Sequence, residues 1–210
     1  MKPYLIKTPK LIKFIFYNWF WSFSSKEKNI YLTFDDGPTP EITEWTLTQL
    51  KKYNAKATFF CIGKNIEAHP DIFQKIIKEG HSIGNHTNNH LNGLKTPNKV
   101  YLDNIEIASN KIGNARSNLF RPPYGKISIR QSFALRKKGY KVIMWDVLSA
   151  DFDTSISNKN CLYNVIMNTR SGSIIVFHDS VKASEKLKFV LPKILGYYAS
   201  KGYTFKKITI

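Results

Sequence analysis

The chain reads Ile-Tyr-Leu-Thr-Phe-Asp-Asp-Gly-Pro at residues 30–38, so two adjacent carboxylates, Asp35 and Asp36, follow an apolar run and precede a turn. Residues 30–34 are typical of a core strand, and the Gly-Pro pair cannot continue a strand. Two like charges a few ångströms apart repel each other unless a cation lies nearby. The stretch therefore predicts a buried strand whose carboxyl end faces a metal ion, an arginine, or both.

Short apolar runs of this kind alternate with helix-like runs along nearly the whole chain. Strands are expected at 30–34, 57–62, 81–85, 118–121, 141–145, 173–177 and 203–208. Helical spacing of apolar residues is found at 41–53, 70–79, 97–112, 128–138, 159–169 and 183–200. This alternation predicts an α/β fold with a parallel sheet. Seven strands without a domain-sized shift in composition favour a single domain, built as a distorted (β/α) barrel, over an open sheet.

The bulk composition is that of a globular protein with a strongly basic surface. The chain has 210 residues, 42% of them hydrophobic, and a formal net charge of +17. Nearly all of the positive charge comes from scattered lysines, and we find no motif that reads nucleic acid, so no nucleic-acid partner is predicted. A solvated lysine-rich surface is favoured over a patch for an anionic partner. Cys61 and Cys161 are expected to be buried structural thiols.

Residues 1–28 form an apolar and aromatic segment ahead of the domain expected at 29–210. Its central run, 11–23, is interrupted by Lys13 and Asn18 and is shorter than the roughly 20 residues of a membrane-spanning helix. Bulky aromatic residues occupy the place where a signal peptide has its cleavage site. We expect the segment to pack on the domain, with interfacial membrane contact through 11–23 as the alternative. A cytoplasmic and an envelope-associated location both stay open, and the sequence indicates no oligomeric state.

Polar clusters follow five of the expected strands, at the ends where parallel α/β folds bind ligands. His86 and His90 in one of them are four residues apart, a spacing that places both imidazoles on one face of a helical turn. Together with one carboxylate they predict a site for a divalent metal ion. Zinc suits this set of ligands, and iron, cobalt and nickel are alternatives. The clusters lie at residues 35–36, 86–90, 121–125, 145–152 and 178–179.

Four motifs in this order resemble those of the polysaccharide deacetylases, the NodB-homology group of carbohydrate esterase family 4. The resemblance spans about residues 29–208. It implies a metal-dependent hydrolase that removes acetyl groups from N-acetylated amino-sugar glycans, such as peptidoglycan or chitooligosaccharides, on a distorted (β/α) barrel. The motifs are Thr33-Phe34-Asp35-Asp36-Gly37-Pro38, His86-Thr87-x-x-His90, Arg121-Pro122-Pro123-Tyr124 and Ile175-x-x-His178.

The resemblance also implies a role for individual residues. Asp35 resembles the catalytic base, and the metal ligands are matched by Asp36, His86 and His90. Arg121 resembles the residue that holds the base through a charge-assisted pair. The backbone N–H of Tyr124 resembles a donor to the oxyanion of the tetrahedral intermediate. His178 resembles the general acid that protonates the leaving amine.

The family has a further motif, Asp-x-x-Asp-Trp, which comes fourth in chain order, just before the motif of His178. This fourth motif is altered here. Its first position is Leu148 and its last is Phe152, whereas Asp151 is retained. We expect Asp151 to pair with the catalytic histidine and to raise the pKa of its imidazole. Substrate contacts are expected from Phe152, Ile175 and Pro123, the first two as an apolar wall for the acetyl methyl group. Asp146 and Asp153 lie nearby and have no assigned role.

Three other functions stay open from the sequence. The altered fourth motif is compatible with a related hydrolase that acts on another C–N bond, in a lipid-linked sugar or a cyclic amide. A catalytically silent sugar-binding domain is a second alternative. Two histidines and one carboxylate also occur in iron oxygenases, which need an oxidisable cosubstrate.

Overall fold

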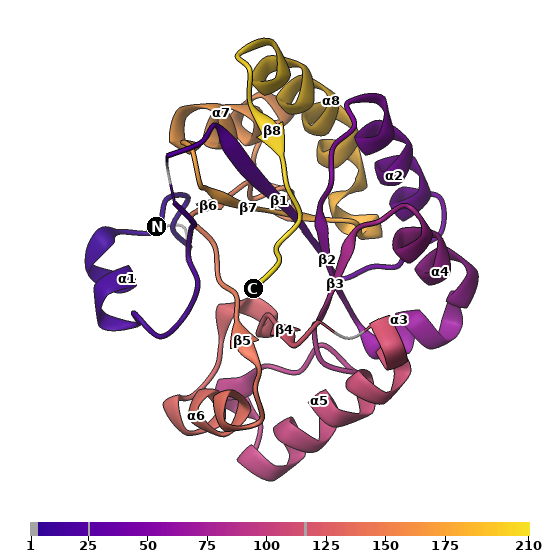
Figure 1. Cartoon of the computed structure of the whole chain (residues 1–210), viewed down its shortest axis with the longest axis vertical. Helices are drawn as coiled ribbons and strands as arrows, with labels where there is room; N and C mark the ends of the chain where they lie inside the picture. Colours follow the sequence, from indigo (N-terminus) through magenta and orange to yellow (C-terminus); the bar gives the residue numbers. More distant parts are fainter. Residues whose placement is uncertain (1–3, 25, 116) are drawn as a thin grey trace.

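The computed structural model describes residues 4–24, 26–115 and 117–210, and its centre is a sheet of parallel strands that curls into a half-barrel (Figure 1). The strand order is β5-β4-β3-β2-β1-β7-β6, and β8 pairs separately with β1. The bounds are β1 (Asn29–Asp35), β2 (Thr58–Cys61), β3 (Ser82–Asn85), β4 (Leu119–Phe120), β5 (Lys141–Val142), β6 (Val147–Leu148), β7 (Ile174–His178) and β8 (Thr204–Phe205). The predicted single-domain barrel of about seven parallel strands is confirmed.

Helices cover the outer face of the sheet, as Figure 1 shows for α2, α4, α7 and α8. Local signals start several of them: Pro70 stands in the first turn of α4, and Ser128 forms a capping box with Gln131 at the start of α6. Cys61 and Cys161 are free and buried, as a structural role predicts. The bounds are α1 (Lys10–Ile15), α2 (Ile42–Lys52), α3 (Gly63–Ala68), α4 (Pro70–Lys78), α5 (Asn98–Ile112), α6 (Ile129–Lys137), α7 (Asn158–Asn168) and α8 (Ser184–Ser200), with single turns η1 (Gly93–Lys95), η2 (Gly113–Ala115), η3 (Pro123–Gly125) and η4 (Val181–Ala183).

The alternation of side chains along β1 determines which of them face the helices and which face the interior and rim of the barrel. Phe34 belongs to the main hydrophobic core, whereas Thr33 and Asp35 point the other way and both bind the guanidinium of Arg121. Asp35 is also the direct partner of His178 in the parallel β1–β7 ladder. Parallel pairing therefore brings the polar clusters that follow the strands to one rim of the barrel.

The C-terminal residues fill the barrel from within. Figure 1 shows the C-terminus inside the ring of strands. The N–H of Ile208 donates to Thr58 Oγ1 at 2.9 Å, and Ser82 Oγ donates to the Ile208 carbonyl at 2.9 Å. The expected strand at 203–208 is shortened to β8, because the residues after it turn inward. Ile208 lies among four side chains of the interior, Phe60, Leu119, Ile143 and Ile174.

The N-terminal segment lies along the open edge between β5 and β6. Lys7 bridges to Val147 of β6, and Phe20 bridges to Ile143 just after β5. Phe20 thereby pairs with the edge of β5 that faces away from β4, with Phe20 N donating to Val142 O at 2.9 Å and Met144 N donating to Phe20 O at 2.7 Å. The expected strand at 141–145 is shortened to β5, and β6 appears where a connection was predicted. Residues 1–3 and 25 of this segment lie outside the described residues.

Asp146 ties this segment to the barrel. Its carboxylate accepts a hydrogen bond from Lys7 Nζ at 2.6 Å, and Lys13 Nζ and Ser173 Oγ also donate to it. Burial by itself favours the neutral acid, but these donors outweigh it and lower the pKa of Asp146 below its ordinary value. The buried indole of Trp21 adds an apolar anchor. Asp146, which had no role from the sequence, is a structural anchor.

Candidate active site

Asp36, His86 and His90 converge at the rim. Asp36 follows β1, whereas the two histidines lie in the loop that follows β3. Asp36 Oδ1 is 3.7 Å from His86 Nε2 and 3.3 Å from His90 Nε2, and one ligand atom of each residue lies within 4.8 Å of the others. Asp36 Oδ1 is buried and accepts no hydrogen bond from the described residues. An electron-rich oxygen is thus buried facing two ring nitrogens.

The hydrogen bonds of His86 determine which of its nitrogens can bind a metal. Its Nδ1 lies 2.8 Å from the carbonyl oxygen of Arg121. Because a carbonyl only accepts, Nδ1 carries the proton and Nε2 presents its lone pair toward Asp36. Burial, with His90 alongside, lowers the pKa of His86 to about 3, so the ring is neutral at ordinary pH. A carboxylate oxygen and an unprotonated imidazole nitrogen at this separation fit a divalent cation between them, and two nitrogens with one oxygen suit zinc.

The loop of the two histidines is not helical, contrary to the expectation from their spacing. Thr87 and His90 adopt positive φ values of 65° and 56°, and these left-handed residues turn both imidazoles inward. Two asparagine side chains hold the loop: Asn85 Oδ1 accepts from Thr87 N at 2.8 Å, and Asn104 Oδ1 accepts from the next two backbone amides at 2.8 and 3.1 Å. The convergence was predicted correctly, but a fixed loop produces it.

Left-handed backbone is concentrated around this site. Such a conformation is unfavourable for residues with a Cβ and persists only where the surroundings enforce it. Asp36 itself has a φ of 81°, which turns its carboxylate away from the line of β1 and toward the histidines. Among the described residues, five of the eight non-glycine positions with positive φ belong to the rim loops: Asp36, Thr87, His90, Tyr124 and Ala150.

Asp35 is held by Arg121, which directly follows β4. Arg121 Nη1 donates to Asp35 Oδ1 at 2.7 Å, and both side chains are buried. The same guanidinium donates to Thr33 Oγ1 and to two backbone carbonyls, and it lies 4.1 Å from the ring centre of Phe60. The two adjacent carboxylates therefore have different partners: Asp35 faces an arginine, and Asp36 faces imidazoles.

His178 and Asp151 form a second polar pair at the rim. Asp151 Oδ1 accepts from His178 Nδ1 at 2.8 Å, and its Oδ2 accepts from the His178 backbone N–H at 2.8 Å. Burial by itself would lower the pKa of the imidazole, but the Asp151 carboxylate, helped by Asp36 and Asp35, raises the pKa of His178 to about 10. His178 is therefore protonated at neutral pH, and its Nε2 is a proton donor.

An aromatic contact connects this pair to the N-terminal segment. The ring of Phe152 meets His178 edge-on with centroids 5.2 Å apart, and Tyr4 meets Phe152 at 5.4 Å. The Tyr4 hydroxyl donates to Asp153, which explains the second carboxylate without a role from the sequence. Phe152 is half-buried beside His178, where it can form an apolar wall.

Two of the residues expected to contact the substrate, Ile175 and Pro123, are buried. Ile175 is completely buried in the main core, and because three positions separate it from His178, the two side chains leave β7 on opposite faces. Ile175 is thus too far inside to touch a substrate, and its expected role is corrected. Pro123 is buried in η3, the turn that carries Tyr124. The Tyr124 side chain is exposed, and its hydroxyl lies 3.0 Å from His90 Nδ1.

Asp179 is a site residue that the sequence did not reveal. It is fully buried, and it accepts hydrogen bonds from Gly37 N at 3.1 Å and from the Thr43 hydroxyl. Burial, with Asp36 nearby, raises the pKa of Asp179 to about 7, although these hydrogen bonds oppose the shift. A Cβ at position 37 would lie only 2.1 Å from an Asp179 oxygen, so the turn requires glycine. That glycine, directly after Asp35 and Asp36, was the feature of the sequence that could have indicated a close contact at this turn.

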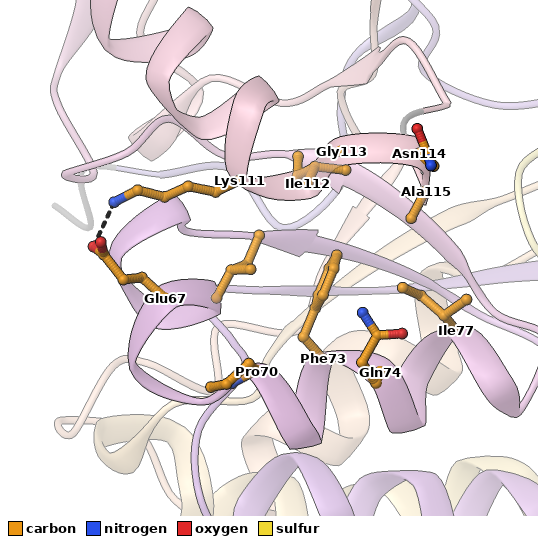
Figure 2. A pocket seen from close by; sticks show the side chains of 11 residues that line it. Glu67, Pro70, Phe73, Gln74, Ile77, Lys111, Ile112, Gly113, Asn114 and Ala115 are labelled. Atoms are coloured by element: carbon orange, nitrogen blue, oxygen red, sulfur yellow. Dashed lines mark hydrogen bonds and ion pairs between the residues drawn. The ribbon is translucent and has the colours of Figure 1, made fainter.

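A hollow of about 490 Å³ at the rim is lined by Asp36, His90 and His69, among others. His81, by contrast, is a core residue whose Nδ1 accepts from Ala57 N at 3.1 Å. Figure 2 shows a separate pocket between α3, α4 and the end of α5, spanned at its edge by the Lys111–Glu67 ion pair at 2.6 Å. Its apolar wall comes from Phe73, Ile77 and neighbouring side chains. None of the rim residues described above lines this pocket.

Comparisons with known proteins agree with this site. The profile of the family described as polysaccharide deacetylase matches residues 24–143. A peptidoglycan-N-acetylglucosamine deacetylase of Bacillus cereus is 33% identical over 193 residues, which cover 90% of this chain and 90% of that protein. Chitin deacetylase 2 of Saccharomyces cerevisiae is 38% identical over 173 residues, 78% of this chain and 54% of the yeast protein.

A solved structure extends the likeness to the fold. The crystal structure of the Bc1960 peptidoglycan N-acetylglucosamine deacetylase, in complex with a naphthalenyl N-hydroxybenzamide, has a TM-score of 0.87 at 31% identity and covers 96% of this chain and 95% of that chain. The barrel and its rim thus define a carbohydrate deacetylase, and the chain belongs to the polysaccharide deacetylase family. The resemblance expected from the four motifs is confirmed.

Proposed function

We propose that this protein is a metal-dependent hydrolase that removes acetyl groups from N-acetylated amino-sugar glycans and releases acetate. The observation that carries the proposal is that the two adjacent carboxylates have different partners: Asp36 faces two imidazoles, and Asp35 is paired with Arg121. The relatives named above deacetylate peptidoglycan and chitin. Polymers of N-acetylated amino sugars are therefore the proposed substrate class.

The metal site is assigned to Asp36, His86 and His90, with zinc as the proposed ion and cobalt or nickel as alternatives. When bound there, the ion polarises the amide carbonyl and activates a water molecule. Asp35 accepts the proton that this water loses as its oxygen bonds to the acetyl carbon. Arg121 holds the Asp35 carboxylate in place through the 2.7 Å pair.

The remaining residues act on the oxyanion, on the leaving nitrogen and on the acetyl methyl group. The backbone N–H of Tyr124 donates to the oxyanion of the tetrahedral intermediate. Protonated His178 then transfers its proton to the amide nitrogen as the C–N bond breaks, so that a free amine and acetate leave. Phe152 contacts the acetyl methyl group. Leu148 is buried in β6, so the altered fourth motif adds no exposed side chain at that position.

Acetate release after metal removal and replacement tests this function. We expect the purified chain to release acetate from chitooligosaccharides or peptidoglycan fragments, to lose at least about 90% of this activity after chelation, and to regain it with Zn²⁺, Co²⁺ or Ni²⁺. His90→Asn is expected to lower the measured metal content together with the activity. His69→Asn, outside the ligand set, is the matched control. Activity that survives complete metal removal would contradict the proposal.

The same assay separates the alternatives. A sugar-binding domain would bind the oligosaccharides without acetate release. A hydrolase for another C–N bond would be inactive on them and active on a formylated sugar or a cyclic amide. An iron oxygenase would require iron and oxygen, whereas we expect the zinc-loaded protein to work without oxygen.

Asp151→Asn tests the role of the His178–Asp151 pair through pH. Without the carboxylate, burial dominates and lowers the pKa of His178 from about 10, so the alkaline limb of the pH–rate profile moves to lower pH. We expect acetate release at pH 8 to fall at least about tenfold.

Stability gives a readout of the same pair that does not depend on activity. Because the pKa of His178 is raised in the folded state, its contribution to stability is complete below about pH 6.5 and is lost as the pH rises toward 10. The unfolding free energy of the wild type should decline over this window more steeply than that of Asp151→Asn. Asp103→Asn, on the exposed face of α5, is the control. An alkaline limb that stays in place in Asp151→Asn would refute the pairing role.

A further inference from the structure

Six large apolar side chains are exposed together on one side of the barrel. Phe14 and Tyr17, in and just after α1, are 78% and 76% exposed, and Ile129 at the start of α6 is 75% exposed. More than half of each of the other three side chains is also exposed. Apolar clusters of this kind mark interaction sites when polar residues surround them. We call this set the apolar face: Leu11, Phe14, Ile15, Tyr17, Ile129 and Phe133.

The two elements that form the apolar face are joined to each other. Trp19 Nε1 donates to Ser132 Oγ at 2.7 Å, and a hollow of about 270 Å³ lies between them, lined by Ile15, Ile129 and Phe133 among others. Beneath α1, Ile12 and Phe16 pack on the core. Lys13 bonds to Asp146 and fixes the helix on the barrel. The apolar face is therefore held in a fixed position on the fold.

The surroundings of the apolar face are positively charged. Neither residues 4–24 nor residues 126–145 contain an aspartate or glutamate. Lys10 stands at the start of α1, and Arg136 lines the hollow beside Phe133. The stretch 126–145 supplies six cations, of which Lys138 lies 3.5 Å from Glu106: Lys126, Arg130, Arg136, Lys137, Lys138 and Lys141.

We propose that the apolar face is an interfacial docking site for a lipid bilayer that contains anionic lipids. Aliphatic and aromatic side chains enter the boundary between headgroups and acyl chains, while lysines and arginines pair with anionic headgroups. None of the helices in the described parts of the chain is long and apolar enough to cross a membrane, and α1 has six residues, so the contact is at the surface. A second copy of the chain fits less well, because two basic faces without acidic residues would repel each other.

Vesicle sedimentation of the full chain tests this proposal. We expect the protein to sediment with vesicles of phosphatidylcholine and 30% phosphatidylglycerol, to bind pure phosphatidylcholine vesicles at least about tenfold more weakly, and to be released in about 0.5 M salt. The paired substitution Phe14→Ser with Tyr17→Ser should weaken binding at least about tenfold. Both side chains are largely exposed, so the fold should tolerate the change.

Two further variants complete the experiment. Tyr163→Ser with Met167→Ser removes two other largely exposed apolar side chains, from α7, and should leave vesicle binding unchanged. Arg130→Gln with Lys137→Gln should weaken binding to anionic vesicles about tenfold and not alter acetate release from a soluble oligosaccharide.

Three results would overturn the proposal: no binding to anionic vesicles, equal binding by the Phe14/Tyr17 variant, or equal binding to neutral vesicles. A dimer in solution that only the Phe14/Tyr17 variant disrupts, without vesicle binding, would assign the apolar face to a second copy instead. Vesicle binding and acetate release are measured separately, so failure of one leaves the other standing.

Discussion

Asp35→Asn is expected to lower the turnover number for acetate release about 10³-fold, within the 10²–10⁴ range of general-base catalysis. An amide of the same size occupies the position but cannot accept the proton of the attacking water. The proposed metal ligands Asp36, His86 and His90 are unchanged, so the metal content should stay at the wild-type level. The measurement is steady-state acetate release with metal content determined on the same sample.

A matched substitution separates loss of the base from loss of a carboxylate in general. Asp103→Asn removes an acid from the exposed face of α5, where it pairs with Lys99 at 2.7 Å, and should leave turnover within about twofold of the wild type. If Asp35→Asn retained more than a tenth of the wild-type turnover with its metal bound, Asp35 would not be the base.

The position of these carboxylates was predictable from the sequence because it depends on one strand and one rule. An apolar run that ends in Asp-Asp-Gly-Pro puts both acids at a carboxyl end, and parallel pairing brings all such ends together. Asp35 and His178 are direct neighbours in the β1–β7 ladder for this reason. The convergence of Asp36, His86 and His90, the Arg121–Asp35 pair and the Asp151–His178 pair all follow from clusters at strand ends.

The features that were missed depend on contacts between distant parts of the chain. The free edge of β5 is paired by Phe20, more than a hundred residues away in sequence. Asp146 and Asp153 are explained only by Lys7, Lys13 and Tyr4 of the N-terminal segment. Local periodicity contains no information about such pairings.

Two other errors concern direction rather than distance. Ile175 was expected to form part of an apolar wall for the acetyl methyl group, but its odd separation from His178 in the strand places the two side chains on opposite faces. The histidine pair was expected on a helical turn, and the loop uses two left-handed residues instead. In the second case Asn104 was a possible indication in the sequence, since it is a polar residue on the mostly apolar buried face of α5, between Tyr101 and Ala108.

Arg121→Met is expected to lower the unfolding free energy by about 3–5 kcal/mol, the cost of breaking a buried ion pair from one side. Arg121 is fully buried and Asp35 nearly so, and the guanidinium satisfies Thr33 and two backbone carbonyls besides the carboxylate. Methionine fills much of the volume but leaves the Asp35 charge without its partner. Denaturant unfolding measures the loss, and Arg170→Met, on the exposed surface, should change stability by less than about 0.5 kcal/mol.

The double variant Arg121→Met with Asp35→Asn distinguishes pairing from simple loss of packing. If the stability cost comes from an unpaired buried charge, removing that charge as well should restore part of it, and the two single effects should fail to add by about 1–3 kcal/mol. Strictly additive effects would mean that Arg121 stabilises the barrel through its contacts with Phe60 and the carbonyls alone. In that case the positioning of the proposed base would have to come from the backbone of β1.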